Sequence, residues 1–198
     1  MDTTLAKWLL LAANQLAPNK NHEPLVEAID KVLSAQAPLF AQDTSRQRSA
    51  ALVLAINFRE GSLIPSIKGD KNKAGKFTSF CSMQIHLPYE AKTEEGWIGD
   101  DLAEDPVKCV TVGVRMLRQS MRMCPKHPVA FYAEGIDNRA CSSTRAQRIS
   151  NDRMFIAQKL VKGVEWPKEE EKDASAQPPL WTVPSRVYAS RMFWEGHH

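Results

Sequence analysis

The sequence has no long hydrophobic run, and none of its apolar stretches approaches the roughly 18 residues that a membrane-spanning helix needs. Glycine is also scarce, with 9 residues among 198, while 8% of the residues are aromatic. This composition excludes collagen-like and fully disordered chains. We therefore expect one soluble globular domain that does not insert into a membrane.

A strong excess of charge of one sign is missing too, because 26 Lys and Arg residues face 23 Asp and Glu residues. A net charge of +3 is too small to indicate nucleic-acid binding by itself. The charges are nevertheless segregated, with six acids and no base in residues 94–105 and five bases and no acid in residues 108–126. A helical nucleic-acid-binding domain, suggested by the arginines at 139–153, is disfavoured because exposed aromatic residues do not accompany them. We expect no nucleic-acid partner.

The N-terminus has no convincing secretory signal peptide. A short apolar core at 8–13 follows a single lysine. The apolar residues of this region lie on one helical stripe, which a signal peptide does not require. These stripe residues are Leu5, Trp8, Leu9, Ala12 and Leu16. We expect a helix of the folded protein here, and the route of delivery stays open.

The cysteines have neither the CxxC nor the Cys/His spacing of a zinc site, so we expect no metal and no cofactor. Buried thiols and one or two disulfides both fit their positions. Cys109 and Cys124 would be about 22 Å apart on an unbroken helix, which is too far for them to pair with each other. The four cysteines are Cys81, Cys109, Cys124 and Cys141.

Hydrophobic residues recur at helical spacing along most of the chain, which predicts a mainly α fold. The segment 50–58 is apolar on all sides, so we place it in the centre of the domain. The last helix is expected to turn Phe155, Ile156 and Leu160 inward and Arg153 outward. Three helices are predicted at 4–16, 106–124 and 129–134. A further helix begins at Pro24, and another runs from a cap at Asp43, Thr44 or Ser45 to Phe58. The last runs from Ser142 or Ser150 to Val164.

The helical pattern stops between Gly61 and Tyr89, where glycine, proline and four lysines predict a loop or a short irregular β-hairpin. We divide the chain into an N-terminal helical hairpin at 1–42, a core at 43–164, and a linker with an aromatic and basic tail at 165–198. The tail, above all residues 180–194, is typical of a segment that docks on a partner.

Glu60 stands at the end of the most apolar helix, in the sequence Ile-Asn-Phe-Arg-Glu-Gly-Ser at 56–62. Burial disfavours the charged form of a carboxylate, which allows such a glutamate to hold a proton and deliver it as a general acid. The alternative is a glutamate of the last helical turn that points to solvent beside Arg59.

Three segments occur in an order that resembles the lysozyme-like lytic transglycosylases of the soluble (SLT) type, which have goose-type lysozymes as hydrolytic relatives. They are residues 59–62 (Arg-Glu-Gly-Ser), 82–85 (Ser-Met-Gln-Ile) and 131–135 (Phe-Tyr-Ala-Glu-Gly). A helix that opens with Asp-Pro at 105–106 and carries a glycine and a leucine, here Gly113 and Leu117, also matches the family.

The chain departs from the family pattern at four places, one of which is a longer loop from Lys68 to Lys76. Gly61 stands between the glutamate and the serine that are normally adjacent. Cys81 and Ser82 occupy the positions of a glycine and a leucine, and Ala133 occupies that of an asparagine. These changes affect the sugar subsites more than the identity of the acid.

The resemblance implies a lysozyme-like domain that cleaves the β-1,4 bond between N-acetylmuramic acid and N-acetylglucosamine in peptidoglycan. Glu60 would be the general acid and base. Gln84 would bind the glycan or position the loop, with Met83 beside it. Ser62 would orient Glu60 or the substrate. Tyr132 would line the site.

The presence or absence of a second carboxylate separates two reactions. Without one, the muramic C6 hydroxyl closes on C1 and an anhydro product forms; with one, water attacks. Asp70 is the one candidate in the following loop, and we favour transglycosylation. The alternatives are a hydrolytic muramidase of goose-type lysozyme character and a non-catalytic glycan-binding or structural module of a phage or injection-type assembly.

The expected partner is the peptidoglycan glycan strand, an anionic polymer that the loop lysines would attract at long range. The protein would then act at the bacterial cell wall, as a bacteriolytic phage or secreted-effector enzyme. These lysines are Lys68, Lys71, Lys73 and Lys76.

Overall fold

The structure is a computed structural model that describes residues 3–134 and 138–167. It is mainly helical, as predicted, and a small two-stranded sheet interrupts the helices after α3. The predicted tail at 180–194 lies outside the described residues. The elements are α1 (Thr4–Leu16), α2 (Glu23–Ser34), α3 (Gln47–Gly61), β1 (Ser79–Phe80), β2 (Ile85–His86), α4 (Gly99–Glu104), α5 (Pro106–Met123), α6 (Ala130–Glu134), a 3-10 helix (Asn138–Cys141) and α7 (Thr144–Gly163).

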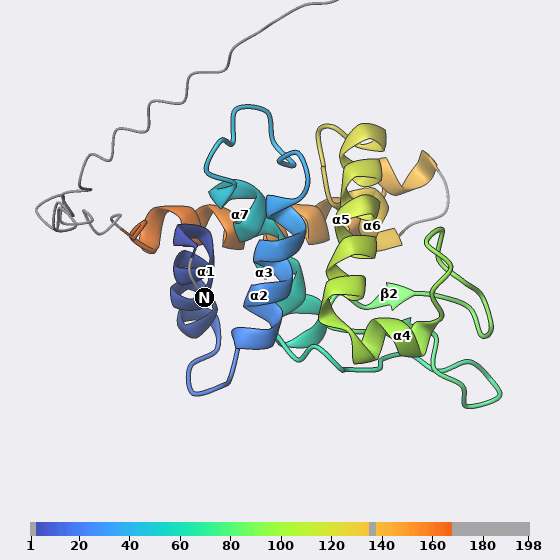
Figure 1. The fold of residues 1–198 in the computed structure, drawn as a ribbon. Helices are drawn as coiled ribbons and strands as arrows, with labels where there is room; N and C mark the ends of the chain where they lie inside the picture. Colours follow the sequence, from blue (N-terminus) through green and yellow to red (C-terminus); the bar gives the residue numbers. More distant parts are fainter. Residues whose placement is uncertain (1–2, 135–137, 168–198) are drawn as a thin grey trace, which may run out of the picture. The chain divides into compact units, whose positions relative to one another are not determined.

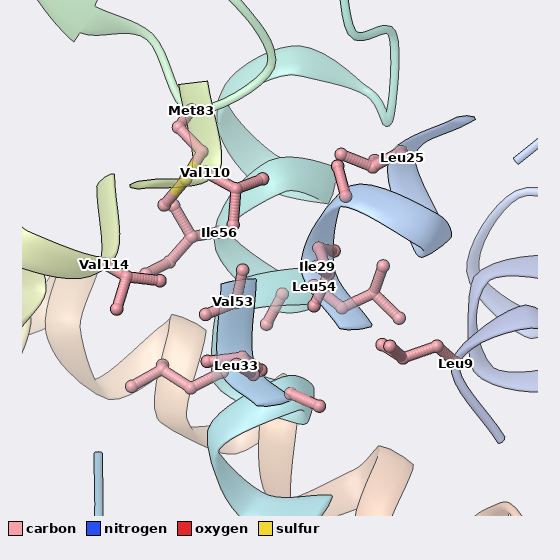
Figure 2. Packing of buried hydrophobic residues seen from close by; sticks show 14 of the residues in the cluster. Leu9, Leu25, Ile29, Leu33, Val53, Leu54, Ile56, Met83, Val110 and Val114 are labelled. Carbon is pink, nitrogen blue, oxygen red and sulfur yellow. The ribbon is translucent and has the colours of Figure 1, made fainter. Parts of the chain in front are cut away.

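Helix α3 forms the centre of the core, as its uniformly apolar sequence predicts. Every residue from 49 to 57 is buried, and α3 packs against α1, α2 and α7 while α2 packs against α5 (Figure 1). Figure 2 shows Val53, Leu54 and Ile56 of α3 among apolar side chains of α2 and α5. Burial of each such side chain stabilises the fold by about 1.5–3 kcal/mol, so the end of α3 is held on a rigid support.

Asp43 binds two of the free backbone donors at the start of α3. Its Oδ2 accepts hydrogen bonds from the backbone N–H of Ser49 at 2.8 Å and from the Ser49 hydroxyl at 2.6 Å, and its Oδ1 accepts one from the N–H of Arg48 at 3.2 Å. The residue directly before α3 is Arg46, so the prediction of a cap at Asp43, Thr44 or Ser45 was wrong in position. The Asp43 side chain nevertheless binds the first turn.

Helices α1 and α2 contribute to the same hydrophobic core as α3, α5 and α7. The indole N–H of Trp8 donates to the carbonyl of Val164 at 3.1 Å, and the rings of Trp8 and Trp166 lie 6.0 Å apart. The first helix is thus joined directly to the end of α7. No helix in the described part of the chain is long and apolar enough to cross a membrane.

The segment after α3 is the short irregular hairpin that the sequence predicts. Strands β1 and β2 pair antiparallel, with Phe80 opposite Ile85, and bridges from residues 68 and 71 extend the pairing. Helix α4 was not predicted, because its six residues are too few to show a hydrophobic period. The Asp101 carboxylate, which accepts the backbone N–H of Ile98 at 3.0 Å, stabilises its first turn.

All four cysteines form disulfides, one of the two arrangements that the sequence left open. Cys81 pairs with Cys109, and Cys124 pairs with Cys141. The first bond ties the turn between β1 and β2 to α5, and the second ties the end of α5 to the 3-10 helix.

The prediction for one face of α7 was wrong at Phe155, which is 56% exposed. Ile156 and Leu160 are buried as expected. Phe155 lies beside the buried stripe, because one residue turns the helix by about 100°, and the Lys159 ammonium covers its ring at 4.6 Å from the centroid.

Candidate active site

Glu60 occupies the last turn of α3 and is partly open to solvent, with 27% of its side chain exposed. Its Oε1 accepts a hydrogen bond from Nη2 of Arg153 in α7 at 2.8 Å. The sequence led us to expect apolar neighbours around this carboxylate. The structure instead gives it a cationic partner and access to solvent, so the expectation of apolar surroundings was wrong.

Arg153 was predicted to point outward, and this was wrong, because only 14% of its side chain is exposed. Its Nη1 contacts Oδ2 of Asp152 at 2.7 Å, and Oδ1 of Asp152 contacts Nη2 of Arg59 at 2.8 Å. The residues Arg59, Asp152, Arg153 and Glu60 therefore form one chain of ion pairs between α3 and α7, which we call the Glu60 network.

The spacing of buried residues in α7 could have identified Arg153. The sequence positions 146, 150, 157 and 160 are buried, and position 153 completes a stripe with steps of four and three residues. A charged residue on the inner stripe of a helix is found almost only where it has a partner. The glutamate at the end of the most apolar helix was the obvious partner to test.

The pKa of Asp152 lies below its ordinary value. Partial burial alone would raise this pKa, but hydrogen bonds from Arg59 and Arg153 and their positive charges outweigh that effect. Each carboxylate oxygen of Asp152 already contacts an arginine. Asp152 is therefore ionised at neutral pH and is not free to take a proton from a water molecule.

Gly61 allows the β1–β2 turn to lie directly against the end of α3. A Cβ at this position would stand 2.4 Å from Cα and 2.6 Å from the carbonyl oxygen of Ser82, so backbone would have to move. The Ser82 hydroxyl donates to Oδ1 of Asn57 at 2.5 Å, and the Asn57 amide donates to the carbonyl of Val53 at 2.7 Å. These contacts account for the glycine at position 61.

Met83 and Tyr132 meet beside Glu60. The Tyr132 hydroxyl donates to the Met83 carbonyl at 2.5 Å, and the Met83 side chain is fully buried against Gly113, where a Cβ would lie 2.1 Å from its sulfur. Burial, and then the negative charge of Glu60, raise the pKa of Tyr132 well above its usual value, while Arg153 opposes them. Tyr132 therefore stays protonated and acts as a hydrogen-bond donor.

Gln84 lies in the same turn as Met83 and has a left-handed backbone conformation with φ of 48°. Its side-chain amide donates to the carbonyl of Cys81 at 2.9 Å, and its Oε1 lies where a side chain at Gly69 would have to fit. The amide is thus held within the turn, so Gln84 positions the loop in this structure.

Ser62 and Asp70 are not joined to Glu60 by any hydrogen bond found in the described residues. Ser62 is exposed and closes α3 in a left-handed conformation, its N–H donating to the carbonyl of Phe58 at 3.0 Å. Asp70 is exposed in the hairpin, where its Oδ2 accepts from the Ser79 hydroxyl at 3.2 Å. Their predicted roles would need contacts that form with substrate.

Two cavities are lined by other parts of the molecule. One of about 120 Å³ lies beside Phe40 and Met154, and one of about 420 Å³ lies beside Arg118 and Arg122. Neither has Glu60 in its lining. No group of three or more His, Cys, Asp or Glu residues in the described ranges could hold a metal ion.

No protein-family model, no curated protein and no solved structure matches this chain in the comparisons with known proteins. The function must therefore be inferred from the chemistry around Glu60. Two groups of residues lie near Glu60. One carries the resemblance to the lytic transglycosylases, and the other is the Glu60 network.

Proposed function

We propose that the protein is a lysozyme-like peptidoglycan lytic transglycosylase that cleaves the β-1,4 bond between N-acetylmuramic acid and N-acetylglucosamine, with Glu60 as general acid and base. One observation carries the proposal. The three segments that resemble the family are far apart in the sequence, yet they lie together at the end of α3, next to Glu60. Gly61 contacts the backbone of Ser82, Tyr132 binds the Met83 carbonyl, and the charge of Glu60 acts on Tyr132.

The reaction needs one group that first gives and then takes a proton. Protonated Glu60 gives its proton to the glycosidic oxygen, and the bond from that oxygen to C1 breaks with its electron pair going to the oxygen. The C6 hydroxyl of the muramic sugar then bonds to C1 and returns its proton to Glu60. An anhydro sugar and a free 4-hydroxyl result, and no water is consumed.

The surroundings of Glu60 favour this route over hydrolysis. A hydrolase of the inverting type needs a second, free carboxylate to activate water. Asp152 is the second carboxylate of the Glu60 network, and each of its two oxygens contacts an arginine. Asp70 is the remaining candidate, and it would give a muramidase of goose-type lysozyme character.

The two disulfides support a site of action at the bacterial cell wall. Disulfides persist in oxidising surroundings such as the periplasm and the cell exterior, and they are rare in reducing cytosol. The hairpin lysines suit an anionic glycan. The Lys71 ammonium lies 4.7 Å from the ring centroid of Phe77, and the Lys76 ammonium lies 5.4 Å from that of Tyr89. A sugar face and a carboxylate could both bind such a surface.

Digestion of purified sacculi tests the proposal. The wild type, Glu60→Gln and the control Glu104→Gln, which alters an exposed carboxylate at the end of α4, are compared by mass spectrometry of the released fragments. We expect anhydro ends from the wild type and the control, and none from Glu60→Gln. Reducing ends would indicate a hydrolase, and binding of the wild type to sacculi without release would indicate a non-catalytic module. Equal release by Glu60→Gln would refute the role of Glu60.

A further inference from the structure

We propose that Arg153 is a positioning residue, which holds the Glu60 carboxylate in its working orientation and stabilises the negative charge that Glu60 acquires when it gives up its proton. This inference rests on the proposed function, because it assigns a role within that reaction. The geometry of the Glu60 network carries it.

The guanidinium of Arg153 is held at two of its nitrogens. Nη1 contacts Asp152 at 2.7 Å while Nη2 contacts Glu60 at 2.8 Å, and Asp152 is itself held by Arg59. The third nitrogen, Nε, is buried and has no hydrogen-bond partner. Since a guanidinium is a rigid plane, fixing Nη1 on Asp152 also fixes the direction in which Nη2 reaches Glu60.

This arrangement divides the work of the Glu60 carboxylate between its two oxygens. Oε1 accepts the bond from Arg153, so the proton that passes to the glycosidic oxygen is carried on Oε2. As that proton leaves, a full negative charge develops on Glu60 beside a cation that is already in place. Preorganised charge of this kind lowers the barrier because nothing has to reorient during the reaction.

The other groups near Glu60 do not supply this charge. Tyr132 in α6 is a neutral phenol whose hydroxyl is used by Met83. Arg59 precedes Glu60 in α3, and its Nη2 contacts Asp152. Among the ion pairs of the described residues, Arg153 is the cation that contacts Glu60.

The test measures kcat and KM on soluble glycan strands for the wild type, Arg153→Ala, Arg153→Lys and Arg59→Ala, with Glu60→Gln beside them. We expect Arg153→Ala to lose kcat by on the order of 10²-fold, as when a preorganised donor is removed, while KM is nearly unchanged. Added guanidinium at millimolar concentration should restore part of the loss by occupying the vacated site. Arg59→Ala, which removes an arginine of the same network without touching Glu60, should lose less and gain nothing from guanidinium.

A purely structural role for Arg153 would give a different result. If Arg153→Ala folds as the wild type does but keeps its kcat, or loses it without recovery in guanidinium, the inference is overturned. Should Arg153→Ala not fold, Arg153→Lys decides, because lysine keeps the charge but offers one nitrogen in place of two. A full kcat for Arg153→Lys would refute the need for the paired geometry, and a lowered kcat at unchanged KM would support it.

Failure of the proposed function itself has a separate signature. If wild type and Glu60→Gln release the same products, or neither releases any, the reaction assigned to Glu60 is wrong and the role of Arg153 in it is overturned as well. If the wild type is active and Glu60→Gln is not, the Arg153 variants alone decide the inference.

Discussion

Removal of the Cys81–Cys109 disulfide should reduce activity more than its effect on stability would explain. Cys81 lies two residues before Met83 and three before Gln84, and its carbonyl accepts the Gln84 amide. Its partner Cys109 is fully buried in α5. The bond thus anchors the turn that covers the end of α3, and serine at both positions releases that turn.

The cost in stability follows from the length of the closed loop. The two bonds span 28 and 17 residues, which corresponds to about 3.5 and 3 kcal/mol of unfolded-chain entropy in the loop-closure model. The Cys124–Cys141 bond is therefore a matched control: its removal should lower the free energy of unfolding by nearly as much. It joins the end of α5 to the 3-10 helix and does not include the Met83 turn.

Both double-serine variants would be measured by urea unfolding and by fragment release from sacculi at a temperature where each is fully folded. We expect similar losses of stability and a selective loss of kcat in Cys81→Ser/Cys109→Ser. Equal activity of the two folded variants would refute the reasoning, since it would mean that the turn keeps its place on α3 without the bond.

Three further predictions follow from single contacts. Gly61→Ala should lower the free energy of unfolding by roughly 1–3 kcal/mol or more, because the added methyl group would press against fixed backbone. Gly163→Ala is the control, since its Cβ would meet its nearest atom at 3.7 Å, and thermal denaturation should show it to be neutral or stabilising. Tyr132→Phe should lower the free energy of unfolding by about 1–3 kcal/mol, because it leaves the Met83 carbonyl without its donor; an unchanged urea midpoint would contradict this. The pKa of Asp152 is lower in the folded protein than in the unfolded chain, where it is about 3.9, so ionised Asp152 stabilises the fold at a pH above the unfolded-state pKa. This stabilisation disappears as the pH falls toward the lower pKa of the folded state. In acid titrations followed by circular dichroism, Asp152→Asn should lack that component.

Much of the fold could be predicted from the sequence, because long apolar periods dominate it. The central position of α3 followed from a segment that is apolar on all sides, and the prolines placed the starts of α2 and α5 within one residue. The start of α7 was left open between Ser142 and Ser150, and the helix begins at Thr144 after a cap at Ser143. Helix α4 could not be found in this way, since a six-residue helix is shorter than two hydrophobic periods. Its stability comes from Asp101 and from tertiary contacts.

The candidate site was predictable in its acid and not in its surroundings. Glu60 stood out by its place at the end of α3, but the ion pair with Arg153 joins residues 93 positions apart. The spacing of α7 places position 153 on its buried stripe, but that spacing alone does not say which distant residue pairs with Arg153. The role of Gly61 was hidden for the same reason, because the backbone that it accommodates belongs to Ser82 in a distant turn.

The contacts of α7 also determine when in the life of the chain the site can exist. Glu60 meets its arginine across 93 positions, and Trp8 meets the Val164 carbonyl across 156. During synthesis from the N-terminus, α1 to α3 are complete long before α7 leaves the ribosome, so contacts of such long range form among the last. Until then Glu60 has neither its guanidinium nor a finished core behind it. The chain therefore has no assembled site until the last described helix has been made.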